Sequence, residues 1–231
     1  MNWWQGIVLG FVQGVTEFLP VSSDGHLVVA EALLGVALPG LTVEITVHVA
    51  TLLAVFIVYG GRGIEVLRKA LQGDHGGRRY LGLLLAATVP AGVVGVGFRS
   101  AFERAFESPA MAAAGFMITG LVLWSTRRAA GRATAETLSY PGALAIGVAQ
   151  AAAILPGVSR SGSTVATALW LGVAPARAAE FSFLMSIPAI LGAAVLELPH
   201  ASASAVDPGP LALAFGTALA VRPPACRVRE A

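Results

Sequence analysis

Apolar and polar positions follow one another along this chain in long blocks. The apolar blocks cover residues 5–19, 25–38, 42–59, 80–98, 110–125, 141–155, 164–174, 181–198 and 209–221. A helix needs about 20 apolar residues to cross the roughly 30 Å hydrocarbon core of a membrane, so several of these blocks are too short to cross it. The pattern predicts an all-α, polytopic integral membrane protein in which some helices cross the membrane and others enter it only partway.

Two pairs of short blocks meet at polar tips. The first tip is formed by residues 19–24 (LPVSSD) and the second by residues 156–161 (PGVSRS). Each tip contains a proline, which disfavours helical geometry at the residue before it and ends the preceding helix. We therefore predict two re-entrant helical hairpins instead of four crossing helices.

An ungapped shift of 137 positions aligns the first hairpin with the second. The identical pairs are Gly10 and Gly147, Gln13 and Gln150, Val21 and Val158, Ser22 and Ser159, Gly25 and Gly162, and Val28 and Val165. Chance matching among apolar residues is the alternative, but polar pairs in step with the glycines favour a true repeat. Such repeats are typically inserted in opposite senses, with the functional site near mid-membrane. We predict one membrane domain over residues 1–221, with inverted repeats over about 5–125 and 141–221, followed by a polar tail at 222–231.

The composition excludes several other classes of protein. Of the 231 residues, 56% are hydrophobic and 12% are charged, and the mean hydropathy is +0.76. A soluble domain has about 25% charged residues, so a soluble domain, a coiled coil and a disordered chain are excluded. The 15 Lys and Arg residues are scattered and the net charge is only +2, which argues against nucleic acid as a partner. The single cysteine, Cys226, excludes an internal disulfide and a thiolate zinc site.

The basic residues predict an orientation in the membrane. The loop expected over residues 60–79 holds five Lys and Arg residues and the loop over 127–140 holds three, whereas the connection between them has only Arg99 and Arg104. The positive-inside rule places the two richer loops in the cytoplasm. The first hairpin then enters from the outer face and the second from the inner face.

Polar groups at membrane depth are costly, so each of them is a candidate for function. The first hairpin gathers Gln13, Thr16, Glu17, Ser22, Ser23, Asp24 and His26 near its tip, and the second begins a helix with Ser159, Arg160, Ser161, Ser163 and Thr164. Hydroxyls and unpaired N–H groups at a helix start bind anions, and the fork of an arginine suits phosphate oxygens. A diphosphate bound with Mg²⁺ or Ca²⁺ fits this set of groups. Helix capping by the serines, a structural ion pair of Glu17 with Arg160 and a packing role for His26 remain alternatives.

Three segments of the chain resemble a known family. Residues 10–26 (GFVQGVTEFLPVSSDGH), 155–164 (LPGVSRSGST) and 180–188 (EFSFLMSIP) are similar to the signature regions of the bacterial undecaprenyl-diphosphate phosphatase family, the bacitracin-resistance type. The resemblance extends from about Gly6 to Glu197. It implies a multi-pass enzyme of the bacterial inner membrane that hydrolyses undecaprenyl diphosphate, a polyprenyl diphosphate lipid, to undecaprenyl phosphate and inorganic phosphate, and so recycles the lipid carrier for peptidoglycan synthesis. The active site is expected to open to the periplasmic or outer face. Whether the protein forms a homodimer is not decided by the sequence.

Carried over by position, the resemblance implies specific roles. We expect catalytic roles for Glu17, Ser23, His26 and Arg160, substrate binding by Ser22, Ser159, Arg160, Ser161 and Thr164, and a divalent cation, Mg²⁺ or Ca²⁺, at Glu17 and Gln13. Either Ser23 or His26 is the expected nucleophile, with the other in support. Glu44 and His48 are ranked as supporting, because a packed polar pair explains them nearly as well.

The chain departs from the family pattern at three places. Gln13 stands where a carboxylate is common, and Asp24 adds a negative charge where Ser or Thr is common. The apolar pattern stops near Val221, before a further membrane helix that family members have, so a truncated or frame-shifted reading frame is expected. A transporter or flippase for a polyprenyl phosphate or a small anion is the rival interpretation, because broken helices in inverted repeats are typical of transporters.

Overall fold

The structure, a computed structural model, describes residues 1–36, 41–201 and 207–221. Its helices are α1 Trp3–Thr16, α2 Ser23–Leu34, α3 Thr42–Leu71, α4 His75–Gly97, α5 Arg99–Phe106, α6 Pro109–Ser125, α7 Arg127–Ala130, α8 Tyr140–Ala152, α9 Arg160–Trp170, α10 Pro175–Ala201 and α11 Pro208–Ala220. Outside the helices, the described residues form one isolated β-bridge, between Ala135 and Val173. The predicted all-α class is confirmed. The predicted tail at 222–231, with Cys226, lies outside the described residues.

Helix length separates crossing helices from half-helices. Four helical segments are long and apolar enough to cross a membrane: Thr42–Leu71, His75–Gly97, Pro109–Ala130 and Pro175–Leu196. The arms of the predicted hairpins, α1, α2, α8 and α9, have 14, 12, 13 and 11 residues. At 1.5 Å per residue the longest arm spans only about 21 Å. The chain is therefore a multi-pass membrane protein whose two hairpins have arms too short to cross.

Both hairpins restart their second helix with the same serine cap. The Ser22 side chain accepts a hydrogen bond from Gly25 N at 3.3 Å, and the Ser159 side chain accepts one from Gly162 N at 3.0 Å. These serines and glycines are the pairs that the shift of 137 positions aligns. Ser22 alone among the described non-glycine residues has a positive φ, 66°, a backbone strain that costs about 1–3 kcal/mol and concentrates at functional sites.

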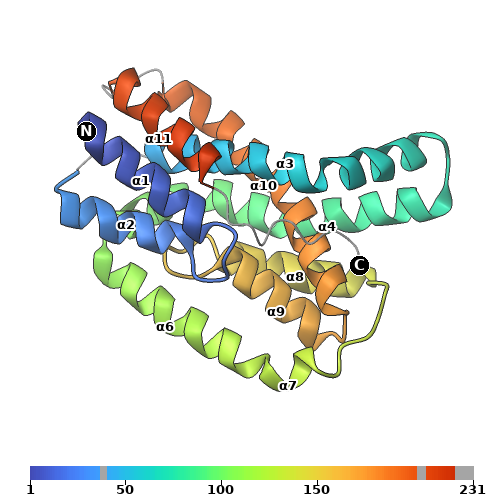
Figure 1. Cartoon of the computed structure of the whole chain (residues 1–231). Coiled ribbons are helices and arrows are strands. Elements are labelled where there is room, and N and C mark those ends of the chain that lie inside the picture. The colour runs from blue at the N-terminus through green and yellow to red at the C-terminus, as the bar shows by residue number, and fades with distance from the viewer. Residues whose placement is uncertain (37–40, 202–206, 222–231) are drawn as a thin grey trace.

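Two hydrophobic cores divide the molecule, and each contains one hairpin. The first core joins side chains of α1, α2, α3 and α11, and the second joins side chains of α4, α8, α9 and α10. Helix α11 packs on α1 as α4 packs on α8, and α3 contacts α10 between the two cores (Figure 1). The predicted repeats are continuous in sequence, but their helices are exchanged in space. Helix α4 belongs to the first repeat and packs in the second core, and α11 belongs to the second repeat and packs in the first core.

The prediction of a loop over residues 60–79 is wrong. Helix α3 continues to Leu71 and α4 begins at His75, so the turn between them is only three residues long. The apolar block ends at residue 59, but Arg62 Nε donates to Glu180 at 2.9 Å, which holds this part of α3 against α10. Ion pairs of Glu65 with Arg62 and Lys69, one turn apart, further support the helix.

Two repeat-related glycines bring helices into backbone contact. A Cβ atom on Gly10 would lie 2.2 Å from the carbonyl oxygen of Ala214 in α11, and one on Gly147 would lie 2.4 Å from that of Ala87 in α4. A methyl group at either position must push two helices apart.

We expect Gly147→Ala to lower the free energy of unfolding by about 1–3 kcal/mol, the usual cost of overpacking. Gly120→Ala is the matched control, because a Cβ at Gly120 in α6 meets open space and alanine favours a helix over glycine by about 1 kcal/mol. Thermal unfolding in detergent measures both variants. Equal melting temperatures for the two variants would contradict the close α8–α4 contact.

Candidate functional site

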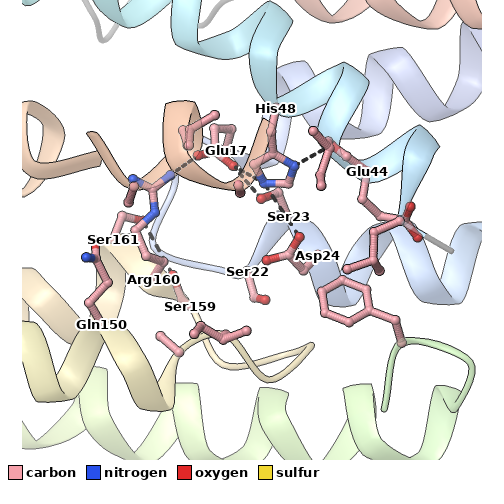
Figure 2. A pocket seen from close by; sticks show the side chains of 18 of the residues that line it. Glu17, Ser22, Ser23, Asp24, Glu44, His48, Gln150, Ser159, Arg160 and Ser161 are labelled. Carbon is pink, nitrogen blue, oxygen red and sulfur yellow. Dashed lines mark hydrogen bonds and ion pairs between the residues drawn. The ribbon is translucent and has the colours of Figure 1, made fainter. Parts of the chain in front are cut away.

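A cavity of about 210 Å³ lies where the two hairpin tips meet α3 and α10. Figure 2 shows its polar side chains converging from both tips and from α3. It is lined by Glu17, Leu19, Ser22, Ser23, Asp24, Leu41, Glu44, Ile45, His48, Phe106, Gln150, Ala153, Ile154, Ser159, Arg160, Ser161, Ala189, Ile190 and Ala193. The polar residues come mainly from the tips and the apolar ones mainly from the surrounding helices. The cavity therefore suits a molecule with a polar head and an apolar body.

Glu17 is the centre of the polar cluster. Its Oε2 accepts hydrogen bonds from Ser23 Oγ at 2.5 Å and from Gln13 Nε2 at 3.2 Å, and His48 Nε2 lies 3.3 Å away. Its Oε1 forms an ion pair with Arg160 of the other hairpin. This buried carboxylate thus links both tips and holds the Ser23 hydroxyl in a hydrogen bond that also suits proton transfer.

The two tips touch directly beside this cluster. A Cβ on Gly25 would lie 2.6 Å from the Cα of Gly157, so the first tip packs on the backbone of the second. Ser161 Oγ also lies 3.4 Å from the carbonyl oxygen of Leu19. The N-termini of α2 and α9 are therefore brought to one place, where their unpaired N–H groups favour an anion.

Thr119 of α6 fixes the second tip and was missed by the sequence analysis. Its hydroxyl donates to Gly157 O at 2.7 Å and accepts from Ser159 N at 2.8 Å, in a buried position. The only signal in the sequence was a hydroxyl residue inside the apolar block at 110–125. Because both backbone groups belong to the tip, Thr119 positions the start of α9 and with it Arg160.

His48 balances the negative charge that Asp24 adds. His48 Nε2 lies 3.3 Å from Glu17 Oε2 and 3.5 Å from Asp24 Oδ1, and its Nδ1 lies 2.7 Å from the carbonyl oxygen of Glu44. A carbonyl oxygen only accepts hydrogen bonds and carboxylates do the same, so this arrangement fits a ring with both nitrogens protonated. His48 and Arg160 then face two carboxylates. The departure at Asp24 is thus matched by a positively charged partner on α3.

Six of the nine predicted site residues line the cavity, and Gln13, His26 and Thr164 do not. The six are Glu17, Ser22, Ser23, Ser159, Arg160 and Ser161. The His26 ring packs edge-on against Phe116, with ring centroids 4.8 Å apart, and its Nδ1 lies 2.7 Å from the carbonyl oxygen of Ser22. The buried Thr164 hydroxyl lies 2.6 Å from that of Ser182 in α10. The catalytic role of His26 and the substrate role of Thr164 stay predictions.

The predicted cation position offers one unpaired oxygen, Gln13 Oε1, which is buried and has no hydrogen-bond partner among the described residues. Four donors already surround the Glu17 carboxylate, and Gln13 Nε2 donates to both Glu17 and Thr51 at 3.2 Å. The described residues contain no group of three or more His, Cys, Asp or Glu residues placed to hold a metal ion. Gln13 Oε1 and the Glu17 carboxylate are oxygen ligands of the kind that Mg²⁺ and Ca²⁺ bind, and the cation site stays a prediction.

The chain is similar in sequence to a known family and to several named proteins. The family described as bacitracin resistance protein BacA matches residues 6–223. Proteins named undecaprenyl-diphosphatase are similar over most of the chain. That of Carboxydothermus hydrogenoformans is 42% identical over 95% of this chain and 84% of its own length, and that of Desulfatibacillum aliphaticivorans is 41% identical over 94% and 84%. That of Methanosphaera stadtmanae is 36% identical over 83% and 75%. The chain therefore belongs to the BacA family of bacitracin resistance proteins.

Proposed function

We propose that the chain hydrolyses undecaprenyl diphosphate to undecaprenyl phosphate and inorganic phosphate, and that it does so in the cavity between the hairpin tips. Membership of the BacA family and relatives named undecaprenyl-diphosphatase support the reaction. The observation that carries the choice of site is the Ser23 hydroxyl, hydrogen-bonded at 2.5 Å to a carboxylate that also pairs with Arg160. A nucleophile, a proton acceptor and an anion-binding group thus lie together.

In this proposal the diphosphate is held by positive groups from both hairpins. The starts of α2 and α9 both line the cavity, and backbone N–H groups there receive phosphate oxygens. Arg160 moves part of its hydrogen bonding from Glu17 to the terminal phosphate, which is favourable because guanidinium and phosphate match in geometry. The apolar wall, which includes Ile45, Phe106 and Ile154, contacts the first part of the lipid chain.

Ser23 and Glu17 carry out the chemical step. Ser23 Oγ attacks the terminal phosphorus and passes its proton to Glu17 Oε2. The bond between that phosphorus and the bridging oxygen breaks, and the bridging oxygen leaves with its electron pair as part of undecaprenyl phosphate. Water then attacks the phosphoserine, and inorganic phosphate is released while the proton on Glu17 returns to Ser23. His26 as nucleophile is the alternative that the sequence analysis left open.

The cellular setting is also part of the proposal. Four apolar helices and the family support a multi-pass membrane protein. We place it in the bacterial inner membrane with the cavity open to the periplasm, where the reaction would return the lipid carrier to peptidoglycan synthesis and confer bacitracin resistance. The homodimer and the divalent cation are proposed without a structural site, and activity in EDTA with and without added Mg²⁺ or Ca²⁺ tests the cation.

Phosphate release by the purified protein separates the enzyme from the rival transporter. We expect detergent-solubilised protein to release phosphate from undecaprenyl diphosphate with multiple turnovers. A transporter needs the anion site but no nucleophile, so binding of the substrate without phosphate release would favour transport and contradict the proposed hydrolysis.

A further inference from the structure

Gln150 is a buried side chain of the cavity wall that the reaction described above does not use. It lies in the last turn of α8 and is only 2% exposed. Among the described residues, neither its Nε2 nor its Oε1 has a hydrogen-bond partner. Buried amide groups are nearly always paired, because an unpaired one loses its hydration without compensation. An amide with both groups unpaired, in the wall of a cavity, indicates that its partner is a ligand.

The repeat makes the unpaired Nε2 of Gln150 specific. Its counterpart in the first hairpin, Gln13, also has a buried Oε1 with no hydrogen-bond partner among the described residues, but its Nε2 donates to Glu17 and to Thr51. At the same shift of 137 positions, Glu17 corresponds to Ile154 and Thr51 to Pro188. The second repeat therefore keeps the glutamine, although apolar residues replace the two residues to which Gln13 donates.

The surroundings of Gln150 indicate the charge of the ligand. Figure 2 shows Gln150 on the same side of the cavity as Arg160 and Ser161, which also line it. The start of α9 and the Arg160 guanidinium make this end of the cavity positive. The carboxylates of Glu44 and Asp24 lie toward its other end, near α3 (Figure 2). The ligand that fits Gln150 best is therefore anionic. It offers an acceptor oxygen to Nε2, and a hydroxyl group or a bound water donates to Oε1.

We infer that Gln150 is a substrate-binding residue for the diphosphate, and this inference rests on the proposed function. Its Nε2 donates to an oxygen of the terminal phosphate. Its Oε1 accepts a hydrogen bond from a water molecule or from a protonated phosphate oxygen. The amide thus holds the terminal phosphate while both of its buried groups become paired.

Gln150→Met tests this inference, because methionine keeps the size and removes the amide. We expect kcat/KM for phosphate release to fall about 10- to 100-fold, the usual effect of a lost hydrogen bond to a charged group. The melting temperature of the free protein should stay equal or rise, because two unpaired buried groups are removed. Inorganic pyrophosphate, used as the probe, should raise the melting temperature of the unsubstituted protein and raise that of the variant much less.

Gln72→Met is the matched control, since Gln72 is exposed at the end of α3 and outside the cavity. It should keep both the activity and the pyrophosphate effect. A Gln150→Met protein with unchanged kcat/KM and an unchanged pyrophosphate effect would overturn the inference, as would a drop in the melting temperature of the free variant with full activity. If the unsubstituted protein binds pyrophosphate through Gln150 but releases no phosphate, the binding role stands and the hydrolase proposal fails. If it neither binds nor hydrolyses, both fail.

Discussion

Replacing Ser23 with alanine is expected to lower kcat for phosphate release by about 10³-fold or more, because the reaction loses its nucleophile. The fold should survive this change. Ser23 contributes one hydrogen bond to Glu17, worth about 1 kcal/mol, and three other donors still surround that carboxylate. Phosphate release and thermal unfolding, measured on the same detergent preparation, separate lost chemistry from lost structure.

Ser139→Ala provides the matched control for Ser23→Ala. Ser139 caps α8 by accepting from Gly142 N at 3.2 Å, far along the helix from the cavity. Its loss should cost about 0.5–2 kcal/mol of stability, as for other N-caps, and leave kcat unchanged. A Ser23→Ala protein that retains a tenth or more of the kcat would contradict nucleophilic attack by Ser23.

Glu17→Gln should produce the second large loss, again about 10²–10⁴-fold in kcat, because the Ser23 hydroxyl loses its proton acceptor. This variant should also unfold more easily. Arg160 then faces a neutral amide, and removing one partner of a buried ion pair costs about 3–5 kcal/mol. Activity must therefore be measured well below the melting temperature of the variant.

A double variant tests the stability effect of the Glu17–Arg160 ion pair. In Glu17→Gln/Arg160→Gln no buried charge of this pair is left alone, so part of the stability should return while activity stays low. Glu103→Gln is the surface control, because Glu103 pairs with Arg99 at 2.8 Å at a partly exposed position, where such a pair contributes about 0–1 kcal/mol. A double variant that melts no higher than Glu17→Gln would contradict the stability cost assigned to the unpaired Arg160.

The sequence was enough to predict which hairpin residues meet. Glu17, Ser23 and Arg160 are polar residues at membrane depth, beside prolines and helix starts. Burying polar groups in a membrane costs free energy, so such residues can be identified as functional candidates from the sequence alone. The cap residues Ser22 and Ser159 could be found from their repeat spacing. The all-α class and the short hairpin arms followed from the lengths of the apolar blocks.

Other parts of the site depend on contacts between distant segments. His48 stands in an apolar block where a packed polar pair explained it nearly as well, and only its distances to Glu17 and Asp24 place it in the charge cluster. The unpaired state of Gln150 is a property of its neighbours, which the sequence around it does not reveal. The helix at residues 60–71 was missed because the apolar block ends at residue 59, whereas a contact between Arg62 and Glu180 holds the helix against α10.

Mapping the phosphorylated residue tests the central claim, hydrolysis through Ser23 between the two hairpin tips, most directly. Purified protein would be mixed with undecaprenyl diphosphate labelled in its terminal phosphate, quenched within the first turnover and digested. The account predicts label on the peptide that contains Ser23, stable in acid as expected of phosphoserine. Acid-labile label on His26, or a full turnover with no label on the protein, would contradict it.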